Sequence, residues 1–270
     1  MPTQSISTFT SVYGPVKSWR YGTSLGIDPI GSVSTCSFNC VYCQLGEIQI
    51  RTNQRQIFVP TEQIICDLQP FAPWDVDVIT LSGNGEPTLA LNLGEIIAQI
   101  KQITHKPVLV LTNGTLLIDP RVRTALSLAD RVSVKVDAVF PEQLRRINRP
   151  IVEFNWQQVW QGIQQFRQDY KGEIGIQTML LTSWDERSKQ RYIELMRSLQ
   201  PDEIQLNTPT RAKPLTHQLE ARGNHTNADS LPYPVQILKQ VSSDILQTFA
   251  EEIYDSTKIL VRCAPHLVNS

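Results

Sequence analysis

The sequence has few cysteines and no apolar run long enough to cross a membrane. Five cysteines in 270 residues, an odd number, do not fit the disulfide framework of a small secreted domain. The first residues are polar and rich in serine and threonine, so they do not resemble a secretory signal. Without a membrane-length apolar stretch, a transmembrane segment is not expected either. These absences predict a cytoplasmic protein of a reducing compartment that makes no membrane contact.

Charge of neither sign is in excess. Lysine and arginine total 25 against 26 aspartates and glutamates, which gives a formal net charge of -1. Such a chain has no general attraction for nucleic acid, so any contact with RNA would depend on a local basic patch. Arg145, Arg146 and Arg149 form a basic cluster that could contact phosphate, and Lys17 and Arg20 could meet an anionic substrate. Solvated surface positions are the alternative for all five.

Three of the five cysteines, Cys36, Cys40 and Cys43, fall within eight residues. A structural zinc site takes four ligands, usually in two separated pairs, and neither a second pair nor a His-x-x-x-His run follows. An iron–sulfur cluster ordinarily takes four cysteines, so three predict a cluster with one iron left open. Inert buried cysteines are the alternative, although such residues do not normally gather in one loop.

The spacing Cys-x-x-x-Cys-x-x-Cys, with Tyr42 directly before the last cysteine, resembles the signature of the radical S-adenosylmethionine (SAM) superfamily. In that superfamily the three cysteines hold a [4Fe–4S] cluster, and SAM chelates the fourth iron. The resemblance implies that Cys36, Cys40 and Cys43 are the cluster ligands and that Tyr42 lies near the adenine. It also implies a radical SAM enzyme, which cleaves SAM reductively to a 5′-deoxyadenosyl radical that abstracts hydrogen from a substrate.

Beyond the cysteines, strand and helix patterns alternate along the chain. Short β-branched runs predict strands, with the run before Cys36 counted as the first, at 76–81, 108–112, 131–137, 173–180 and 203–207. Apolar residues at helical spacing, together with capping signals at Asp119 and Ser183, predict helices at 61–71, 93–103, 119–128, 156–170 and 183–199. Repeated βα units give a parallel sheet flanked by helices.

Two of the predicted strands have a polar face. Ser133, Lys135 and Asp137 alternate with three valines, and Gln177 lies opposite the isoleucines of the next strand. If helices cover the apolar face, these polar side chains must look into an enclosed interior. Six βα units with polar residues inside predict a partial (β/α)6 barrel, open on one side, which is also the architecture that the resemblance implies. A doubly wound sheet is the alternative.

The run Gly83-Asn84-Gly85-Glu86-Pro87 follows the second predicted strand. Glycines let the backbone approach a ligand, and free amides and carbonyls at a strand end can bind an amino group, although a plain tight turn is the alternative. The run resembles the glycine-rich GGEP element of the superfamily, with Asn84 at the second position. The resemblance implies that Gly83, Gly85 and Glu86 contact the methionine amino group of SAM.

Four more polar side chains end or line neighbouring strands of the predicted barrel. They are Asn113, Ser133, Lys135 and Gln177. Their amide, hydroxyl and ammonium groups suit the ribose and carboxylate of SAM. An internal hydrogen-bond network with Asp137 is the alternative.

The chain divides into a flexible N terminus at 1–12, a barrel at 13–210, and a C-terminal part at 211–270. The polar run at 211–231 is too long for an ordinary connection, and it follows a barrel strand at the end where such folds place their active sites. We therefore expect a lid there, with a disordered excursion as the alternative. A final helix is predicted at 235–253 and a short strand or packing tail at 259–261.

Segments spread over residues 13–210 resemble the branch of the superfamily related to tRNA wyosine synthesis, among them 144–150 and 206–211. This resemblance implies a tRNA nucleoside as substrate. The alternatives are an activase that places a glycyl radical on a partner protein and a cluster-carrying sensor without turnover. No flavin-binding or second-cluster module is evident, so we expect an external one-electron donor, flavodoxin or ferredoxin.

Overall fold

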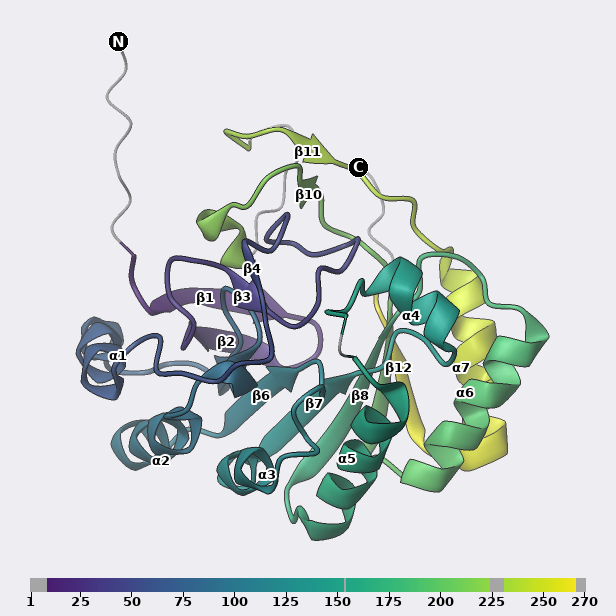
Figure 1. Ribbon diagram of the computed structural model, residues 1–270, viewed down its shortest axis with the longest axis horizontal. Coiled ribbons are helices and arrows are strands. Elements are labelled where there is room, and N and C mark those ends of the chain that lie inside the picture. The colour runs from purple at the N-terminus through teal and green to yellow at the C-terminus, as the bar shows by residue number, and fades with distance from the viewer. Residues whose placement is uncertain (1–8, 153, 224–230, 266–270) are drawn as a thin grey trace.

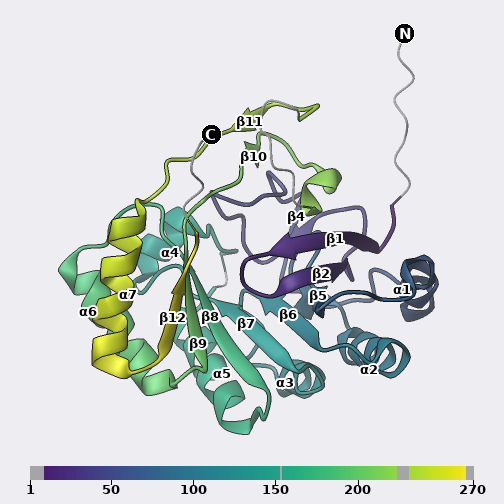
Figure 2. The same ribbon diagram turned by 180° about the vertical axis from the view of Figure 1, so that it is seen from behind.

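The computed structural model describes residues 9–152, 154–223 and 231–265. One curled sheet of eight strands forms the centre, and helices cover its outer face (Figures 1 and 2). The strands, in spatial order, are β1 (Val12–Ser18), β2 (Gly22–Ile27), β5 (Val78–Leu81), β6 (Val108–Thr112), β7 (Arg131–Lys135), β8 (Glu173–Met179), β9 (Glu203–Asn207) and β12 (Leu260–Cys263).

All neighbouring strands of this sheet run parallel, except that β1 is antiparallel to β2. Alternation along the strands sends one set of side chains outward, where valines, isoleucines and leucines such as Val134, Ile176 and Leu206 are fully buried in the core beneath the helices. The opposite set, which includes the polar residues, faces the inside of the curl. The prediction of an open partial barrel is therefore confirmed.

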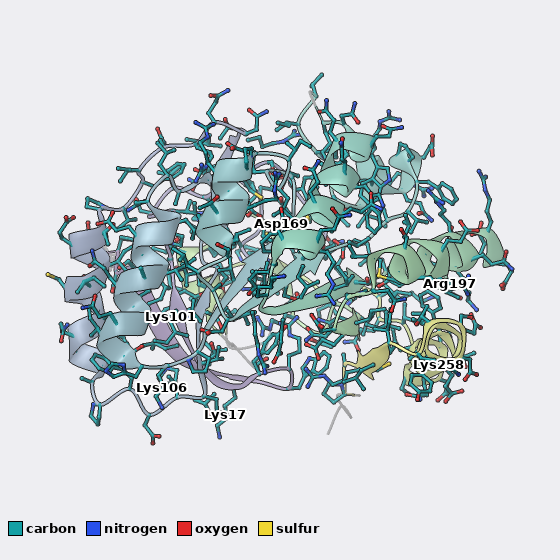
Figure 3. All side chains as sticks on the ribbon, turned by 90° about the horizontal axis from the view of Figure 1, so that it is seen from below. Lys17, Lys101, Lys106, Asp169, Arg197 and Lys258 are labelled. Carbon is teal, nitrogen blue, oxygen red and sulfur yellow. The ribbon has the colours of Figure 1, made fainter. Side chains whose placement is uncertain are left out.

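Seven α-helices accompany the sheet in the described residues. They are α1 (Thr61–Leu68), α2 (Leu93–Thr104), α3 (Pro120–Leu126), α4 (Pro141–Ile147), α5 (Trp156–Asp169), α6 (Glu186–Leu199) and α7 (Ser243–Thr257). Figure 3 shows the end of the molecule where the helices α2, α5, α6 and α7 finish. The labelled residues Lys101, Asp169, Arg197 and Lys258 lie at or next to these helix ends. Within the same residues no helix has both the length and the apolar character needed to span a membrane.

Short elements lie above the opposite edge of the sheet, where the parallel strands end (Figure 1). Two pairs of two-residue strands are found there, β3 (Thr35–Cys36) with β4 (Ile50–Arg51) and β10 (Lys213–Pro214) with β11 (Val235–Gln236). The 3₁₀ turns η2 (Pro87–Leu89) and η3 (Leu219–Arg222) also lie at this edge, whereas η1 (Gln69–Phe71) continues α1 toward the start of β5. This edge also carries the loop that contains Cys36, Cys40 and Cys43, called the cysteine loop below, and the described residues of the segment 211–236.

The predicted flexible terminus at 1–12 is wrong for its last residues. Ser11 is fully buried and its backbone N–H donates to Asp67 Oδ2 at 2.8 Å, and β1 begins at Val12. The run after it forms the β1–β2 hairpin, and β2 is the strand predicted before Cys36. At Gly26 an added Cβ would lie 2.3 Å from the ring of Tyr13, so this glycine makes room for an aromatic ring. Residues 1–8 lie outside the described part of the chain.

Two predicted helix starts also differ from the structure. Asp185, not Ser183, caps α6, because its carboxylate accepts the N–H of Ser188 at 2.8 Å. The last helix begins at Ser243 instead of residue 235, since Val235 pairs with Pro214 as part of a strand. The predicted cap at Asp119 and the strand near residues 259–261, now β12, are confirmed.

Candidate active site

The cysteine loop is stitched to the loop at 83–87 by backbone hydrogen bonds. Thr35 N–H donates to the carbonyl of Asn84 at 3.1 Å, and Glu86 N–H donates to the carbonyl of Thr35 at 3.0 Å. A Cβ at Gly85 would lie 1.8 Å from that same Thr35 oxygen, so only glycine permits this approach. Two segments about fifty residues apart therefore meet at the carboxyl ends of β2 and β5.

The three cysteines of the loop are half-buried free thiols, and amides from distant segments approach two of them. Asn113 Nδ2 lies 3.5 Å from Cys36 Sγ, and Asn148 Nδ2 lies 3.4 Å from Cys40 Sγ. Asn113 directly follows β6, so the end of this strand lies beside the cysteines. Amide donors of this kind stabilise a thiolate more than a thiol.

Burial raises the pKa of all three thiols. For Cys36 the carboxylate of Glu86 adds to burial, and the pKa lies well above its ordinary value. Burial, followed by the charge of Asp137, raises the pKa of Cys40 to about 12. Burial also raises the pKa of Cys43, where the ammonium groups of Lys213 and Lys135 oppose it. The thiols are therefore protonated without metal, and iron must displace these protons when it binds.

This donor set fits an iron–sulfur cluster. In the described residues no group of three or more His, Cys, Asp and Glu side chains converges on a single metal ion. A cubane cluster does not require that convergence, because each thiolate binds a different iron atom. Three thiols from one loop, with amide donors at two of the sulfurs, match such a cluster.

The side chain of Asp28 packs against Gly83 in the loop at 83–87. Gly83 has a left-handed φ of +92°, and a Cβ there would lie 2.4 Å from the carboxylate carbon of Asp28. Asn84, which replaces the second glycine of the GGEP element, is fully buried and donates through Nδ2 to the carbonyl of Gly31 at 2.8 Å. Its side chain therefore binds the cysteine loop, while its carbonyl accepts from Thr35.

Both carboxylate oxygens of Glu86 accept hydrogen bonds from other residues of the protein. Oε1 accepts from Thr88 N, Thr88 Oγ1 and Thr112 Oγ1, and Oε2 accepts from Asn113 N at 2.7 Å. Burial raises the pKa of Glu86, and these hydrogen bonds oppose the rise. The side chain fixes the ends of β5 and β6, and both of its oxygens are engaged within the protein.

Tyr42, Lys135 and Asp137 form an internal network. The Tyr42 hydroxyl and Asn148 Nδ2 both donate to Asp137 Oδ2, and Met179 N donates to Oδ1 at 2.8 Å. Lys135 Nζ lies 3.8 Å from Asp137 Oδ1 and 4.9 Å from the centre of the Tyr42 ring. The predicted network alternative is therefore present. The long Lys135–Asp137 distance leaves the ammonium able to bind a further anion.

Ser133 lies two residues deeper in the barrel than Lys135, on the same inner face, and Gln177 lies level with Lys135 on β8. The Ser133 hydroxyl is buried and has no hydrogen-bond partner. Gln177 Nε2 donates to Gln205 Oε1 at 3.2 Å. A buried donor without a partner is rare in a folded protein and indicates a position where a ligand or water binds.

The segment for which a lid was predicted contacts the loop at 83–87 and the residues just after the cysteines. His217 Nε2 lies 2.7 Å from Asn84 Oδ1, and Gln218 N donates to the carbonyl of Leu45 at 2.9 Å. Residues 224–230, also within the predicted lid, lie outside the described part of the chain. Sequence reasoning missed His217 and Asn148 as neighbours of the site, because no local pattern distinguishes a histidine or an asparagine that contacts a distant loop.

Comparison with known proteins decides the family. A model of the Radical SAM superfamily matches residues 31–199, a span that includes the cysteine loop, the loop at 83–87 and the strands β5 to β8. The chain belongs to the radical SAM superfamily. It is accordingly an enzyme, and membership implies the [4Fe–4S] cluster and SAM that define this superfamily.

Relatives of this radical SAM protein include two UPF0026 proteins. A UPF0026 protein of Synechocystis sp. is 58% identical over 259 residues, which are 96% of this chain and 98% of the relative. A UPF0026 protein of Methanocaldococcus jannaschii is 35% identical over 208 residues, 75% of this chain and 64% of the relative. The structure of Streptococcus suis SuiB bound to S-adenosylmethionine shares the fold, with a TM-score of 0.61 at 10% identity over 87% of this chain and 49% of SuiB.

Proposed function

We propose that Cys36, Cys40 and Cys43 hold a [4Fe–4S] cluster, that SAM binds at its open iron, and that the enzyme abstracts hydrogen from a substrate. The observation that carries this proposal is the pair of backbone hydrogen bonds by which Thr35 joins the cysteine loop to residues 83–87. It sets three thiols beside a strand end whose glycines let the backbone reach an amino group. This arrangement supports a cluster bound next to the methionine part of SAM.

The reduced cluster would supply the electron that cleaves SAM to methionine and a 5′-deoxyadenosyl radical. The chain itself binds and orients these groups. Lys135 suits the carboxylate of SAM, and the Tyr42 ring, held by Asp137, offers a face to the adenine. Ser133 and Gln177 line the interior where the ribose and the substrate meet. An external one-electron donor, flavodoxin or ferredoxin, transfers the electron to the cluster.

We propose a tRNA nucleoside as the substrate, in line with the wyosine-like segments of the sequence. The exposed arginines 145, 146 and 149 lie at the end of α4, and this end touches the cysteine loop: Val41 N donates to Ile147 O at 2.9 Å and Asn39 N to Asn148 O at 3.0 Å. An RNA phosphate bound there would bring a neighbouring nucleoside close to the cluster.

A surface pocket next to α4 supports the same substrate class. Its volume is about 400 Å³, and Arg145, Phe154, Asn155 and Trp156 are among the residues that line it. Unpaired RNA bases are bound in proteins by stacking on aromatic rings and by amide hydrogen bonds, next to cations that meet the phosphates. The pocket offers all three kinds of group.

The test is anaerobic reconstitution with iron and sulfide, followed by dithionite and SAM. We expect release of 5′-deoxyadenosine, and transfer of deuterium into it from a deuterated cellular RNA fraction. Arg145→Ala together with Arg146→Ala should reduce that transfer at least tenfold, whereas Arg121→Ala on α3, a surface arginine paired with Asp119, should not. Transfer from the protein fraction instead would indicate an activase, and a complete lack of 5′-deoxyadenosine would indicate a sensor.

A further inference from the structure

Side-chain amides from distant parts of the chain contact two of the three proposed cluster ligands. Asn113 directly follows β6, and its Nδ2 lies 3.5 Å from Cys36 Sγ. Asn148 directly follows α4, and its Nδ2 lies 3.4 Å from Cys40 Sγ. Hydrogen bonds to the sulfurs are among the features that set the reduction potential of an iron–sulfur cluster. The two asparagines are therefore placed to affect that potential.

The amide of Asn148 is held beside Cys40 by contacts that do not involve a cluster. Val41, the next residue after the cysteine, donates its backbone N–H to the carbonyl of Ile147 at the end of α4, at 2.9 Å. Nδ2 of Asn148 also donates to Asp137 Oδ2 at 2.7 Å. Because the amide nitrogen carries two hydrogens, it can donate to the carboxylate and to the sulfur at the same time.

The amide of Asn113 is held beside Cys36 in a similar way. Its Nδ2 donates to Ser37 Oγ at 2.9 Å, and its Oδ1 accepts from the backbone N–H and the hydroxyl of Thr115 at 3.0 and 2.7 Å. The two donors at Oδ1 determine which end of the amide is the oxygen, so the NH₂ group is the end that faces the sulfur. Asn113 is buried, which limits competition from water.

The same two sulfurs lie near buried carboxylates. Burial and then the charge of Glu86 raise the pKa of Cys36, and burial and then the charge of Asp137 raise the pKa of Cys40. Each carboxylate therefore disfavours negative charge on its sulfur, including the charge that reduction of a cluster adds. At Cys43 burial also raises the pKa, but the neighbouring charges are ammonium groups, which oppose the rise.

Each asparagine connects one of these sulfurs to its carboxylate. Asn113 donates its backbone N–H to Glu86 Oε2 at 2.7 Å, while its side-chain amide lies at Cys36 Sγ. Asn148 shares its Nδ2 between Asp137 and the other sulfur. The amides thus contact the two sulfurs that have a carboxylate nearby, and the positive ends of their N–H dipoles offset the effect of that carboxylate.

We propose that Asn113 and Asn148 are positioning residues for the cluster, and that their N–H···S hydrogen bonds raise its reduction potential. This inference rests on the proposed function, because it concerns the cluster that the three cysteines would hold. One-electron reduction adds negative charge to the cluster and its sulfurs, so a donor at a sulfur stabilises the reduced state more than the oxidised state. The two amides thus favour transfer of one electron from the external donor despite the buried carboxylates.

The midpoint potential of the reconstituted full-length enzyme tests this inference. It is measured anaerobically and without SAM, from the electron paramagnetic resonance signal of the reduced cluster during a redox titration. Leucine is close to asparagine in size and cannot donate, so Asn113→Leu and Asn148→Leu should each disfavour reduction about three- to tenfold, where tenfold is a potential about 59 mV lower. Thr115→Val removes a hydrogen bond to Asn113 Oδ1 but leaves the donor to Cys36, so its potential should equal that of the wild type.

Electron spin echo spectroscopy gives a second measurement that needs no variant. The enzyme is labelled with ¹⁵N in the side-chain amides of asparagine and is then reconstituted and reduced. We expect a coupling between ¹⁵N and the cluster spin in the wild type, weaker in each leucine variant that holds the cluster. Absence of this coupling in the wild type would show that no asparagine amide reaches the sulfurs. That result overturns the inference, even if a leucine variant binds no iron.

The titrations can overturn the inference in two further ways. Both leucine variants, with full iron content, can have the potential of the wild type, or Thr115→Val can lower the potential as much as they do. In either case, release of 5′-deoxyadenosine by the wild type leaves the proposed function standing. A wild type that binds no iron contradicts the proposed function and this inference together. Iron content, measured for every protein, therefore separates the two failures.

Discussion

Arg222 places its guanidinium 2.7 Å from the carboxylate of Asp28, and the two side chains are only 7% and 0% exposed. Arg222 also lies over the rings of Phe9 and Tyr13, with its guanidinium carbon 5.3 and 5.0 Å from their centres. Asp28 directly follows β2 and accepts the N–H of Ile30 at 2.9 Å. This buried ion pair therefore joins η3, which contains Arg222, to the residues that lead from β2 into the cysteine loop.

Arg222→Met should destabilise the protein by about 3–5 kcal/mol at neutral pH, because it leaves the Asp28 carboxylate buried and unpaired. Burial raises the pKa of Asp28 and Arg222 opposes the rise, so the variant raises it further. An acid whose pKa is raised by folding stabilises the fold below its unfolded pKa, and this stability is lost as the pH rises through the folded value. The deficit should therefore be small in acid and grow toward neutral pH.

Urea denaturation at a series of pH values measures this deficit. Arg191→Met, at a half-exposed arginine paired with Glu194 on α6, serves as the control and should cost less than about 1 kcal/mol at every pH. A deficit of equal size at all pH values would show that the Asp28 carboxylate is not the group left uncompensated.

The contact between His217 and Asn84 makes a second prediction. Asn84 is fully buried, so His217→Leu leaves its Oδ1 without the protein donor that lies 2.7 Å away. The loss should be about 1–3 kcal/mol, measured by chemical denaturation. Gln218→Leu is the matched control, since its Nε2 donates to Thr216 Oγ1 at the surface. In the background of Asn84→Gly the effect of His217→Leu should shrink, and full additivity would argue against the contact.

Glu86→Gln should destabilise the protein more than its small change in size suggests. Both carboxylate oxygens accept hydrogen bonds, from Thr88, Thr112 and Asn113, so in either orientation the glutamine NH₂ faces a donor. We expect a loss of about 1–3 kcal/mol. Thermal unfolding measures it, with Glu95→Gln on an exposed face of α2 as the control. An unchanged melting temperature would mean that Glu86 is protonated in the native protein.

Much of the barrel follows from local patterns in the sequence. Alternation with period two placed Ser133, Lys135 and Gln177 on the inner face, because a strand buried under helices must turn its polar residues the other way. Asp119 followed by proline specified the start of α3 through a cap that involves only neighbouring residues. Predictions of this kind need no knowledge of distant contacts.

Several of the misses depend on long-range contacts. The antiparallel strand β1 was not predicted, and it depends on Gly26, which accommodates the ring of Tyr13 across two strands. A helix was predicted to begin at Val235, but this residue pairs as a strand with Pro214, twenty-one residues earlier. The position of Asn148 beside Cys40 arises from the packing of α4 on the cysteine loop. Such pairings are set by tertiary structure and leave no periodic signal in the sequence.

Iron content and SAM cleavage of Cys40→Ser, compared with Cys66→Ser, test the central claim most directly. Cys66 is the exposed free cysteine on α1, outside the loop. After anaerobic reconstitution, the wild type and Cys66→Ser should bind about four irons per chain and release 5′-deoxyadenosine with dithionite and SAM. Cys40→Ser should lose most of the iron and all of the cleavage. If Cys40→Ser instead keeps both at the wild-type level, the three-cysteine cluster is contradicted.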